Sequence, residues 1–216
     1  MSSPLVSTCL GVYGGLQCFE YPLAHPSWQT CAFPLPGNGD PGHTLRMFTI
    51  SRIEQDDWKE ARALRLRALV RDPMAFGSTH AREEAFEPVE WERRLRENHW
   101  YWAHGEQGPV GLAACIPEEG DVRARRLISM WVDESVRGTA VASELFWKVA
   151  SCAYGDGAER LVFCVMSDNP RAKAFYEREG ALQLDRASIE GSSVATARTE
   201  EPYELWLPGR LLDQRS

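Results

Sequence analysis

Paired cysteines, long apolar runs and a surplus of basic residues are all missing from this sequence of 216 residues. No two cysteines form a CxxC pair, and no histidine follows one at a zinc-like spacing, which argues against a metal site. We therefore expect no bound metal and reduced thiols, as in a cytoplasmic protein. The six cysteines are dispersed along the chain, at Cys9, Cys18, Cys31, Cys115, Cys152 and Cys164.

No apolar stretch approaches the roughly 20 residues that a membrane-spanning helix needs. The segment 1–19 has no basic start, and Gly and Ser interrupt its apolar run, so we expect no signal peptide. With 24 basic and 31 acidic residues the net charge is -7. This balance argues against a nucleic-acid partner, because a phosphate-binding surface is normally basic, and it suits a cationic substrate slightly better.

Residues 1–46 differ in character from the rest of the chain. They contain three charged residues, Glu20, Asp40 and Arg46, and six of the 13 prolines. No helical or strand periodicity persists there, and the run PGNGDPG is typical of turns and linkers. We expect an extension that is disordered or loosely packed, or a mis-assigned start ahead of Met47. A docking extension that belongs to the native protein is the alternative.

Residues 47–216 read as one domain of the α/β (α+β) class. Two apolar runs joined around GEQG predict a hairpin, and later strands alternate with helices. Strands that are first paired by hairpins and then joined through helices predict a mixed, mostly antiparallel sheet flanked by helices. The expected strands are 48–52, 99–105, 109–117, 127–132, 160–166, 181–185 and 202–207, and the expected helices are 57–72, with Asp56 as its cap, 87–98, 143–154 and 169–180.

A short loop joins the apolar strand 127–132 to the helix that follows it. A loop that opens directly onto a helix presents unpaired backbone N–H groups, which can bind an anion such as a phosphate. In this loop Gly138 follows Arg137 directly, and the small residues Gly138 and Ala142 lie on either side of Thr139–Val141. We expect a phosphate-binding loop here.

A second pattern follows the next strand. Asn169 begins a helix that carries Ala172 and Tyr176 and ends at Gly180. Pro170 suits the first turn of this helix, where a missing N–H costs nothing. By itself, Tyr176 on an amphipathic helix is better explained as a core aromatic residue.

Together the segments over residues 127–181 resemble the GNAT superfamily of acyl-CoA N-acetyltransferases. The resemblance implies a GNAT-like fold and acetyl-CoA as cosubstrate, with no metal. It also implies that an acetyl group passes to an amine-bearing small molecule or peptide by direct attack in a ternary complex. A non-catalytic CoA-binding or protein-interaction module on the same fold is the alternative, and a homodimer is one option for the assembly.

The resemblance also assigns roles to particular residues. Tyr176 would protonate the departing thiolate, and Asn169 would orient the pantetheine arm. A central Gly of the family's loop is replaced by Ala140, whose methyl group would cost about 1 kcal/mol if the backbone there needed a positive φ. Cofactor contacts are expected from the splayed strand residues Met130, Trp131 and Val132, with an oxyanion donor near Val132, and from the loop residues Arg137, Gly138, Thr139, Ala140, Val141 and Ala142.

The base that deprotonates the amine is not evident from the sequence. The strand 127–132 carries no carboxylate. Trp100 and Trp102 share one strand face and are either walls of an acceptor cleft or core residues, and Cys164 is expected to be buried and inert. The candidates for the base are Glu83, Glu84, Glu118 and Glu119, with a water held by Ser129 as a further option.

Overall fold

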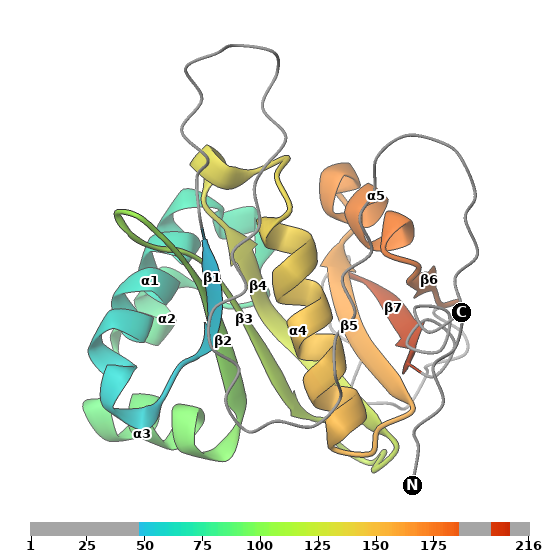
Figure 1. The fold of residues 1–216 in the computed structure, drawn as a ribbon, viewed down its shortest axis with the longest axis horizontal. Coiled ribbons are helices and arrows are strands. Elements are labelled where there is room, and N and C mark those ends of the chain that lie inside the picture. Colours follow the sequence, from blue (N-terminus) through green and yellow to red (C-terminus); the bar gives the residue numbers. More distant parts are fainter. Residues whose placement is uncertain (1–47, 186–199, 208–216) are drawn as a thin grey trace, which may run out of the picture.

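The computed structural model describes residues 48–185 and 200–207 (Figure 1). The expectations for residues 1–46 lie outside these ranges, as does most of the loop between the last two strands. Within the described part, no helix has the combined length and apolarity that spanning a membrane would require.

Seven strands form a single sheet in the order β1-β2-β3-β4-β5-β7-β6. Every neighbouring pair is antiparallel except β4 and β5, which run parallel. The hairpin around GEQG joins β2 to β3, and a helix crossover makes the parallel pair possible. The predicted mixed, mostly antiparallel sheet is therefore confirmed. The strands are β1 (Thr49–Arg52), β2 (His99–Gly105), β3 (Gly108–Pro117), β4 (Ala124–Val132), β5 (Arg160–Met166), β6 (Leu182–Gln183) and β7 (Glu200–Trp206).

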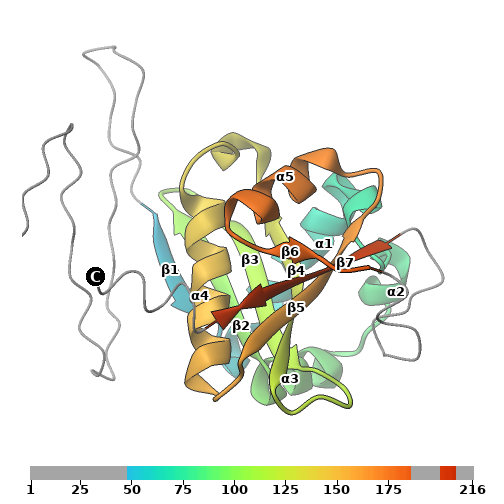
Figure 2. The ribbon, with the colours of Figure 1, turned by 90° about the vertical axis from the view of Figure 1, so that its right-hand side faces the viewer.

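Helices cover both faces of the sheet (Figures 1 and 2). One face packs against α1 (Trp58–Arg71) and α3 (Pro88–Glu97), and the short α2 (His80–Glu84) lies beside α1. The other face packs against α4 (Val141–Gly155) and α5 (Pro170–Arg178). Because both faces are covered, the central strands are apolar at nearly every position instead of alternating with polar residues.

Two hydrophobic clusters occupy the two faces and follow the period-2 alternation of the strands. On β2, Trp100 and Trp102 belong to the cluster under α1 and α3, whereas Tyr101 and Ala103 belong to the cluster under α4. The same alternation on β3 places Leu112 on one face and Ala113 on the other. The two tryptophans therefore do share a strand face.

The start of α1 and the segment before α3 differ from the sequence-based expectation. Asp56 does not cap α1, because it lies within a 3₁₀ turn, Gln55–Asp57, whose capping box joins Glu54 and Asp57. The helix α2 was not predicted. The Thr79 hydroxyl accepts a hydrogen bond from the Arg82 N–H and caps α2. Because α2 has only five residues and no apolar periodicity, this cap was not recognised in the sequence.

Strands β4 and β5 separate after a short paired region. They pair through Ala124–Arg126 and Arg160–Val162, while both strands continue several residues further. On its other edge β4 carries a bulge, because Leu112 faces Trp131 while Ala114 faces Ile128, so that two residues oppose one. Ser129, within this bulge, has φ 58, a left-handed conformation that is uncommon for a residue other than glycine.

Gly111 lies where β3, β4 and α4 approach most closely. A Cβ at this position would lie 2.9 Å from Leu145 Cδ1 and 3.0 Å from both Trp131 O and Val132 Cγ1. We expect Gly111→Ala to lower the free energy of unfolding by about 1–3 kcal/mol, because a close-packed interface must shift to admit the methyl group. Urea denaturation would measure this change.

Gly155→Ala is a matched control for that prediction, because a Cβ at Gly155 would meet no atom within 4 Å. Gly155 ends α4 and does not have a positive φ. Alanine there is expected to raise the free energy of unfolding by about 0.4–1 kcal/mol, since it reduces the number of conformations of the unfolded chain. Equal losses of stability in the two variants would contradict the packing argument at Gly111.

Candidate functional site

The loop between β4 and α4 is shaped by one glycine. After a 3₁₀ turn, Glu134–Val136, the backbone at Gly138 has φ 82, and a Cβ there would meet nothing within 4 Å. Ala140 has φ -70 and ψ -13, an ordinary right-handed conformation. The expected backbone cost of alanine at position 140 is therefore wrong, because the left-handed residue of the loop is Gly138. The Ala140 methyl group packs against the core cluster under α4.

The predicted loop residues 137–142 lie together at the start of α4. Within the described residues, the N–H groups of Gly138, Ala140 and Ala142 donate no recorded hydrogen bond. The Thr139 hydroxyl donates to Val136 O at 2.6 Å, which holds the turn, and the N–H of Val141 points to Thr139 Oγ1 at 3.4 Å. Unpaired N–H groups at the N-terminus of a 15-residue helix form a site suited to an anion.

The Arg137 side chain turns away from these N–H groups. Its Nε donates to Val132 O at 3.0 Å, and its Nη2 donates to the Asp72 carboxylate, which also accepts from Trp131 Nε1 at 2.7 Å. Arg137 thus fastens the loop to the C-terminal end of α1. Any role of Arg137 in anion binding would come from its backbone.

The end of β4 presents backbone groups to the gap beside β5. The N–H of Asp133 donates to Val110 O at 2.7 Å, toward β3. Because N–H groups alternate in direction along a strand, the N–H of Val132 points away from β3, into the gap. Met130 and Val132 pack against the cluster under α4, whereas Trp131 belongs to the cluster under α1.

Asn169 caps α5. Its Oδ1 accepts from the N–H of Ala172 at 3.0 Å, and Pro170 occupies the first helical position, as its fixed φ favours. The amide Nδ2 makes no recorded hydrogen bond within the described residues. Asn169 is therefore a helix cap whose amide group remains available as a donor.

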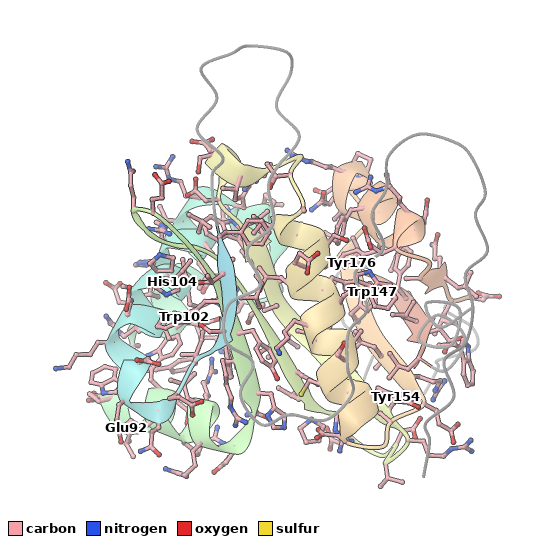
Figure 3. All side chains as sticks on the ribbon, viewed as in Figure 1. Glu92, Trp102, His104, Trp147, Tyr154 and Tyr176 are labelled. Carbon is pink, nitrogen blue, oxygen red and sulfur yellow. The ribbon has the colours of Figure 1, made fainter. Side chains whose placement is uncertain are left out.

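Tyr176 lies deep in the cluster under α4 (Figure 3). Its ring lies 4.4 Å from the ring of Phe163 on β5 and 5.5 Å from that of Phe146 on α4, centroid to centroid. No hydrogen bond of its hydroxyl to another described residue is recorded. Burial raises the pKa of Tyr176 far above its ordinary value, so the hydroxyl keeps its proton and can act as a hydrogen-bond donor.

The C-terminal end of α5 is tied to α4 near Tyr176. The Glu179 carboxylate is buried and accepts from Ser143 Oγ at 2.9 Å and from Trp147 Nε1 at 2.7 Å. Burial, with a contribution from the charge of Glu179, raises the pKa of Glu144 in the first turn of α4. These contacts fix the position of α5, and hence of the Tyr176 ring, relative to α4.

A cavity of about 440 Å³ lies on the other face of the sheet. It extends from α1 and the segment before α2 to the place where β4 and β5 separate. Trp100 lines it, whereas Trp102 does not and donates from Nε1 to Ser51 Oγ at 2.8 Å. Its lining includes Arg65, Phe76, Glu83, Trp100, Ser129 and Glu200.

The expected bases are already engaged by cations or lie outside this cavity. Burial raises the pKa of Glu83, but hydrogen bonds from Arg65 and its charge outweigh burial, and the pKa is lowered overall. Glu118 accepts two hydrogen bonds of 2.6 Å from Arg126. Glu84 is exposed, with His80 Nδ1 at 3.4 Å, and Glu119 is exposed. Burial raises the pKa of Cys164 to about 11, which keeps it a thiol, but Cys164 is half-buried and lines the cavity, so the expectation that it is buried is wrong.

Glu200 is a lining residue that the sequence did not reveal. It begins β7, opposite Met166 of β5, and a Cβ on Gly77 would lie 2.9 Å from Glu200 Oε1. Its carboxylate therefore lies over the segment before α2. Glu200 follows a polar loop in the sequence. It reaches the cavity because β7 pairs with β5, and no local sequence pattern predicts which strand β7 pairs with.

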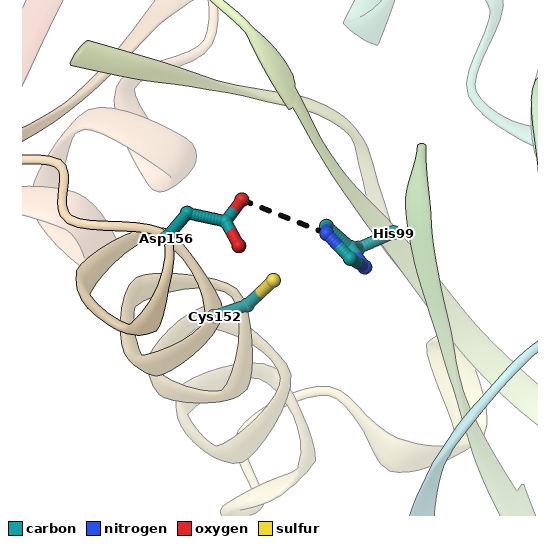
Figure 4. Close-up of side chains that lie close together, drawn as sticks. All are labelled: His99, Cys152 and Asp156. Atoms are coloured by element: carbon teal, nitrogen blue, oxygen red, sulfur yellow. Dashed lines mark ion pairs between the residues drawn. The ribbon is translucent and has the colours of Figure 1, made fainter. Parts of the chain in front are cut away.

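The structure also brings together His99, Cys152 and Asp156, three residue types that can hold a metal (Figure 4). Their ligand atoms lie within 4.8 Å of one another, with His99 Nε2 3.5 Å from Asp156 Oδ2. A hydrogen bond with Cys115 lowers the pKa of Cys152 to about 7, although burial opposes this. Arg125 Nε lies 3.1 Å from the same carboxylate oxygen, so the charge of Asp156 is compensated by the protein itself.

Both the sequence and the fold of this chain are similar to those of known proteins. The sequence model described as the acetyltransferase (GNAT) family matches residues 58–181. No curated protein matches the chain. Among solved structures, an acetyltransferase from Streptococcus agalactiae 2603 is similar with TM-score 0.60 and 19% identity, over 74% of this chain and 98% of that one.

Two further solved structures have the same fold. An acetyltransferase of the GNAT family from Staphylococcus aureus Mu50 aligns with TM-score 0.60 and 17% identity, over 74% of this chain and 99% of that one. The Salmonella typhimurium protein yncA, in a structure with its cofactor acetyl-CoA, aligns with TM-score 0.55 and 12% identity, over 75% and 95%. At these identities the likeness concerns the fold.

Proposed function

The chain belongs to the acetyltransferase (GNAT) family, and on that premise we propose that it transfers an acetyl group from acetyl-CoA to a primary amine by direct attack in a ternary complex. The observation that carries the proposal is the separation of β4 from β5 beyond Arg126 and Val162. On one side of this gap lie the loop before α4 and Tyr176, and on the other lies the 440 Å³ cavity. This arrangement supports a gap through which an anionic cofactor on one face would meet an acceptor on the other.

The residues on the α4 side fit acetyl-CoA. The free N–H groups of Gly138, Ala140 and Ala142 would hold the diphosphate, and the open space at Gly138 leaves room for it. The N–H of Val132 would donate to the thioester carbonyl oxygen as negative charge develops on it. Asn169 would orient the pantetheine arm through its amide Nδ2.

The burial of Tyr176 refines its proposed role. A phenol whose pKa is raised is a weaker acid than the thiol of CoA, since a thiol has a pKa of about 8.5. Tyr176 would therefore donate a hydrogen bond to the sulfur and stabilise the charge that develops on it, while complete proton transfer would come later. This role requires the hydroxyl to stay protonated, which its surroundings ensure.

Glu200 is the residue we assign as the base. An amine that arrives as ammonium must lose a proton before it can attack, because alkylammonium groups have pKa values of about 10. Of the described residues lining the cavity, Glu83 and Glu200 carry carboxylates, and Arg65 occupies both oxygens of Glu83. We assign the role to Glu200 because its carboxylate lies at the cavity beside Gly77, from where it would accept the proton directly or through a water beside Ser129.

Release of free CoA thiol tests the proposed function. We expect the purified full chain to release thiol from acetyl-CoA with at least one class of amine. Acetyl-CoA at one hundred times its Kd should also stabilise the protein by about 2.7 kcal/mol in a thermal unfolding experiment. Adenosine, which lacks the diphosphate, serves as the control and should stabilise much less. Stabilisation without thiol release from any amine would favour a non-catalytic CoA-binding module.

A further inference from the structure

We propose that the acceptor carries a carboxylate in addition to its amine, as an amino acid does, and that Arg65 and Trp100 bind this carboxylate. The inference rests on the proposed function and specifies the substrate class of the same cavity. Two features of the described residues support it: two buried donors without partners in this part of the chain, and the fixed orientation of one guanidinium.

Two side chains that line the cavity each carry a buried donor without a partner. Arg65 is 4% exposed and Trp100 is 2% exposed. Arg65 Nη1 and Trp100 Nε1 are both buried, and neither makes a hydrogen bond. Buried donors in folded proteins are nearly always paired, and leaving one unpaired costs about 1–3 kcal/mol. A ligand with hydrogen-bond acceptors would satisfy both donors.

The orientation of Arg65 is fixed before any ligand binds. Its Nε and Nη2 donate to the Glu83 carboxylate at 3.1 and 2.8 Å, and its guanidinium lies 4.3 Å from the centroid of the Phe76 ring. These contacts occupy one edge and one face of the guanidinium. Its Nη1 remains without a hydrogen-bond partner among the described residues. A group held in this way loses little conformational entropy on binding, which favours recognition of an anionic oxygen.

The charges around the cavity are close to balanced. Among the described residues, five arginines line it, Arg65, Arg82, Arg93, Arg94 and Arg126, with the two carboxylates Glu83 and Glu200. Glu90, Glu97 and Glu118 lie outside the lining and pair with Arg93, Arg94 and Arg126. Recognition of a carboxylate would therefore depend on the unpaired Nη1 of Arg65 and not on a general excess of positive charge.

The extent of the cavity suits an acceptor with two functional ends. Arg65 and Trp100 line the same cavity as Ser129 and Met166, which belong to β4 and β5 where these strands separate. A carboxylate bound by Arg65 and Trp100 would leave the amine of the same molecule to reach the gap beside Glu200. A volume of about 440 Å³ lies within the range of small-molecule pockets, which favours a free amino acid or a short peptide.

Matched pairs of acceptors test the inference with the full chain and acetyl-CoA. Each of the common L-amino acids is compared with its carboxamide, which keeps the amine and the side chain but loses the carboxylate charge. We expect the best acceptor to be an acid whose kcat/KM exceeds that of its amide at least tenfold. Equal or better rates with the amides would overturn the inference while leaving the proposed acetyl transfer intact. If no amine is acetylated, both fail together.

Trp100→Phe tests the indole N–H with little change in shape. We expect a five- to tenfold higher KM for the preferred acid, a nearly unchanged kcat, and a reduced ratio of acid to amide. Trp91→Phe is the matched control, because Trp91 is equally buried and also carries an unpartnered Nε1, but it lies outside the cavity lining. An unchanged ratio in Trp100→Phe would mean that water alone satisfies this donor, and would overturn its assigned role.

Discussion

Glu200→Gln is expected to lower kcat at pH 7 by at least a hundredfold. An amide cannot accept the proton that the amine must lose, and removal of a general base typically costs a factor of about 10²–10⁴. The side chain keeps nearly the same shape, so the cavity and the binding of acetyl-CoA should change little. The activity that remains should rise with pH toward the pKa of the amine, about 10, because the free base then comes from solution.

The pH profile of kcat/KM measures this effect in the wild type and in two variants. Glu201→Gln is the matched control: Glu201 is adjacent in the sequence, but it lies 2.7 Å from Lys173 Nζ and does not line the cavity. The control should keep both the rate and the shape of the profile. If Glu200→Gln retained the wild-type kcat at pH 7, the proton would have to leave by another route, such as a water beside Ser129.

Tyr176→Phe is expected to lower kcat by about a hundredfold with little change in the affinity for acetyl-CoA. The variant removes a hydrogen bond that is made to the sulfur only as charge develops there, and one such donor is worth roughly a factor of 10²–10³. The lower end of the range applies because a thiolate is already a good leaving group. Since no partner of the hydroxyl is recorded among the described residues, the free energy of unfolding should change by less than about 1 kcal/mol.

The shape of the pH profile separates this role from an acid that titrates. Burial raises the pKa of Tyr176, so the hydroxyl keeps its proton at every pH at which the enzyme is assayed. Tyr176→Phe should therefore lower kcat by the same factor at each pH, and the pH values at which kcat rises and falls should not change. Tyr203→Phe is the control, because the Tyr203 ring stacks 5.8 Å from that of Phe163 in the same cluster, while its hydroxyl donates to Glu177 at 3.3 Å. An unchanged kcat in Tyr176→Phe would leave Tyr176 as a core residue.

The local structure between β4 and α5 could be predicted because its parts follow one another in the sequence. The end of β4, the loop at Gly138 and the cap at Asn169 lie within residues 127–181, and each depends on local backbone chemistry. A strand, a glycine with a positive φ and a side-chain cap all leave a pattern in neighbouring residues. One detail differs, because the residue of the loop with a positive φ is Gly138 and not Ala140. The role of these residues in binding acetyl-CoA stays a prediction.

The acceptor side could not be predicted in the same way. Arg65, Trp100 and Glu200 come from α1, β2 and β7, and they surround one cavity because the sheet places β7 next to β5. Which cation engages which carboxylate is decided by pairing across elements: Arg65 engages Glu83, and Arg126 engages Glu118. The sequence contains many carboxylates and arginines, but it does not indicate which of them form ion pairs.

The sequence by itself determined the seven strands and the four longer helices in their order, the hairpin between β2 and β3, and the loop and cap at the starts of α4 and α5. These features depend on residues that are close in the chain, whose hydrogen bonds and φ angles are set locally. Only the tertiary structure decided where β4 separates from β5, which described donors are buried without partners, and that burial raises the pKa of Tyr176. Desolvation and ion pairing depend on everything packed around a group, and much of that surrounding comes from distant parts of the chain.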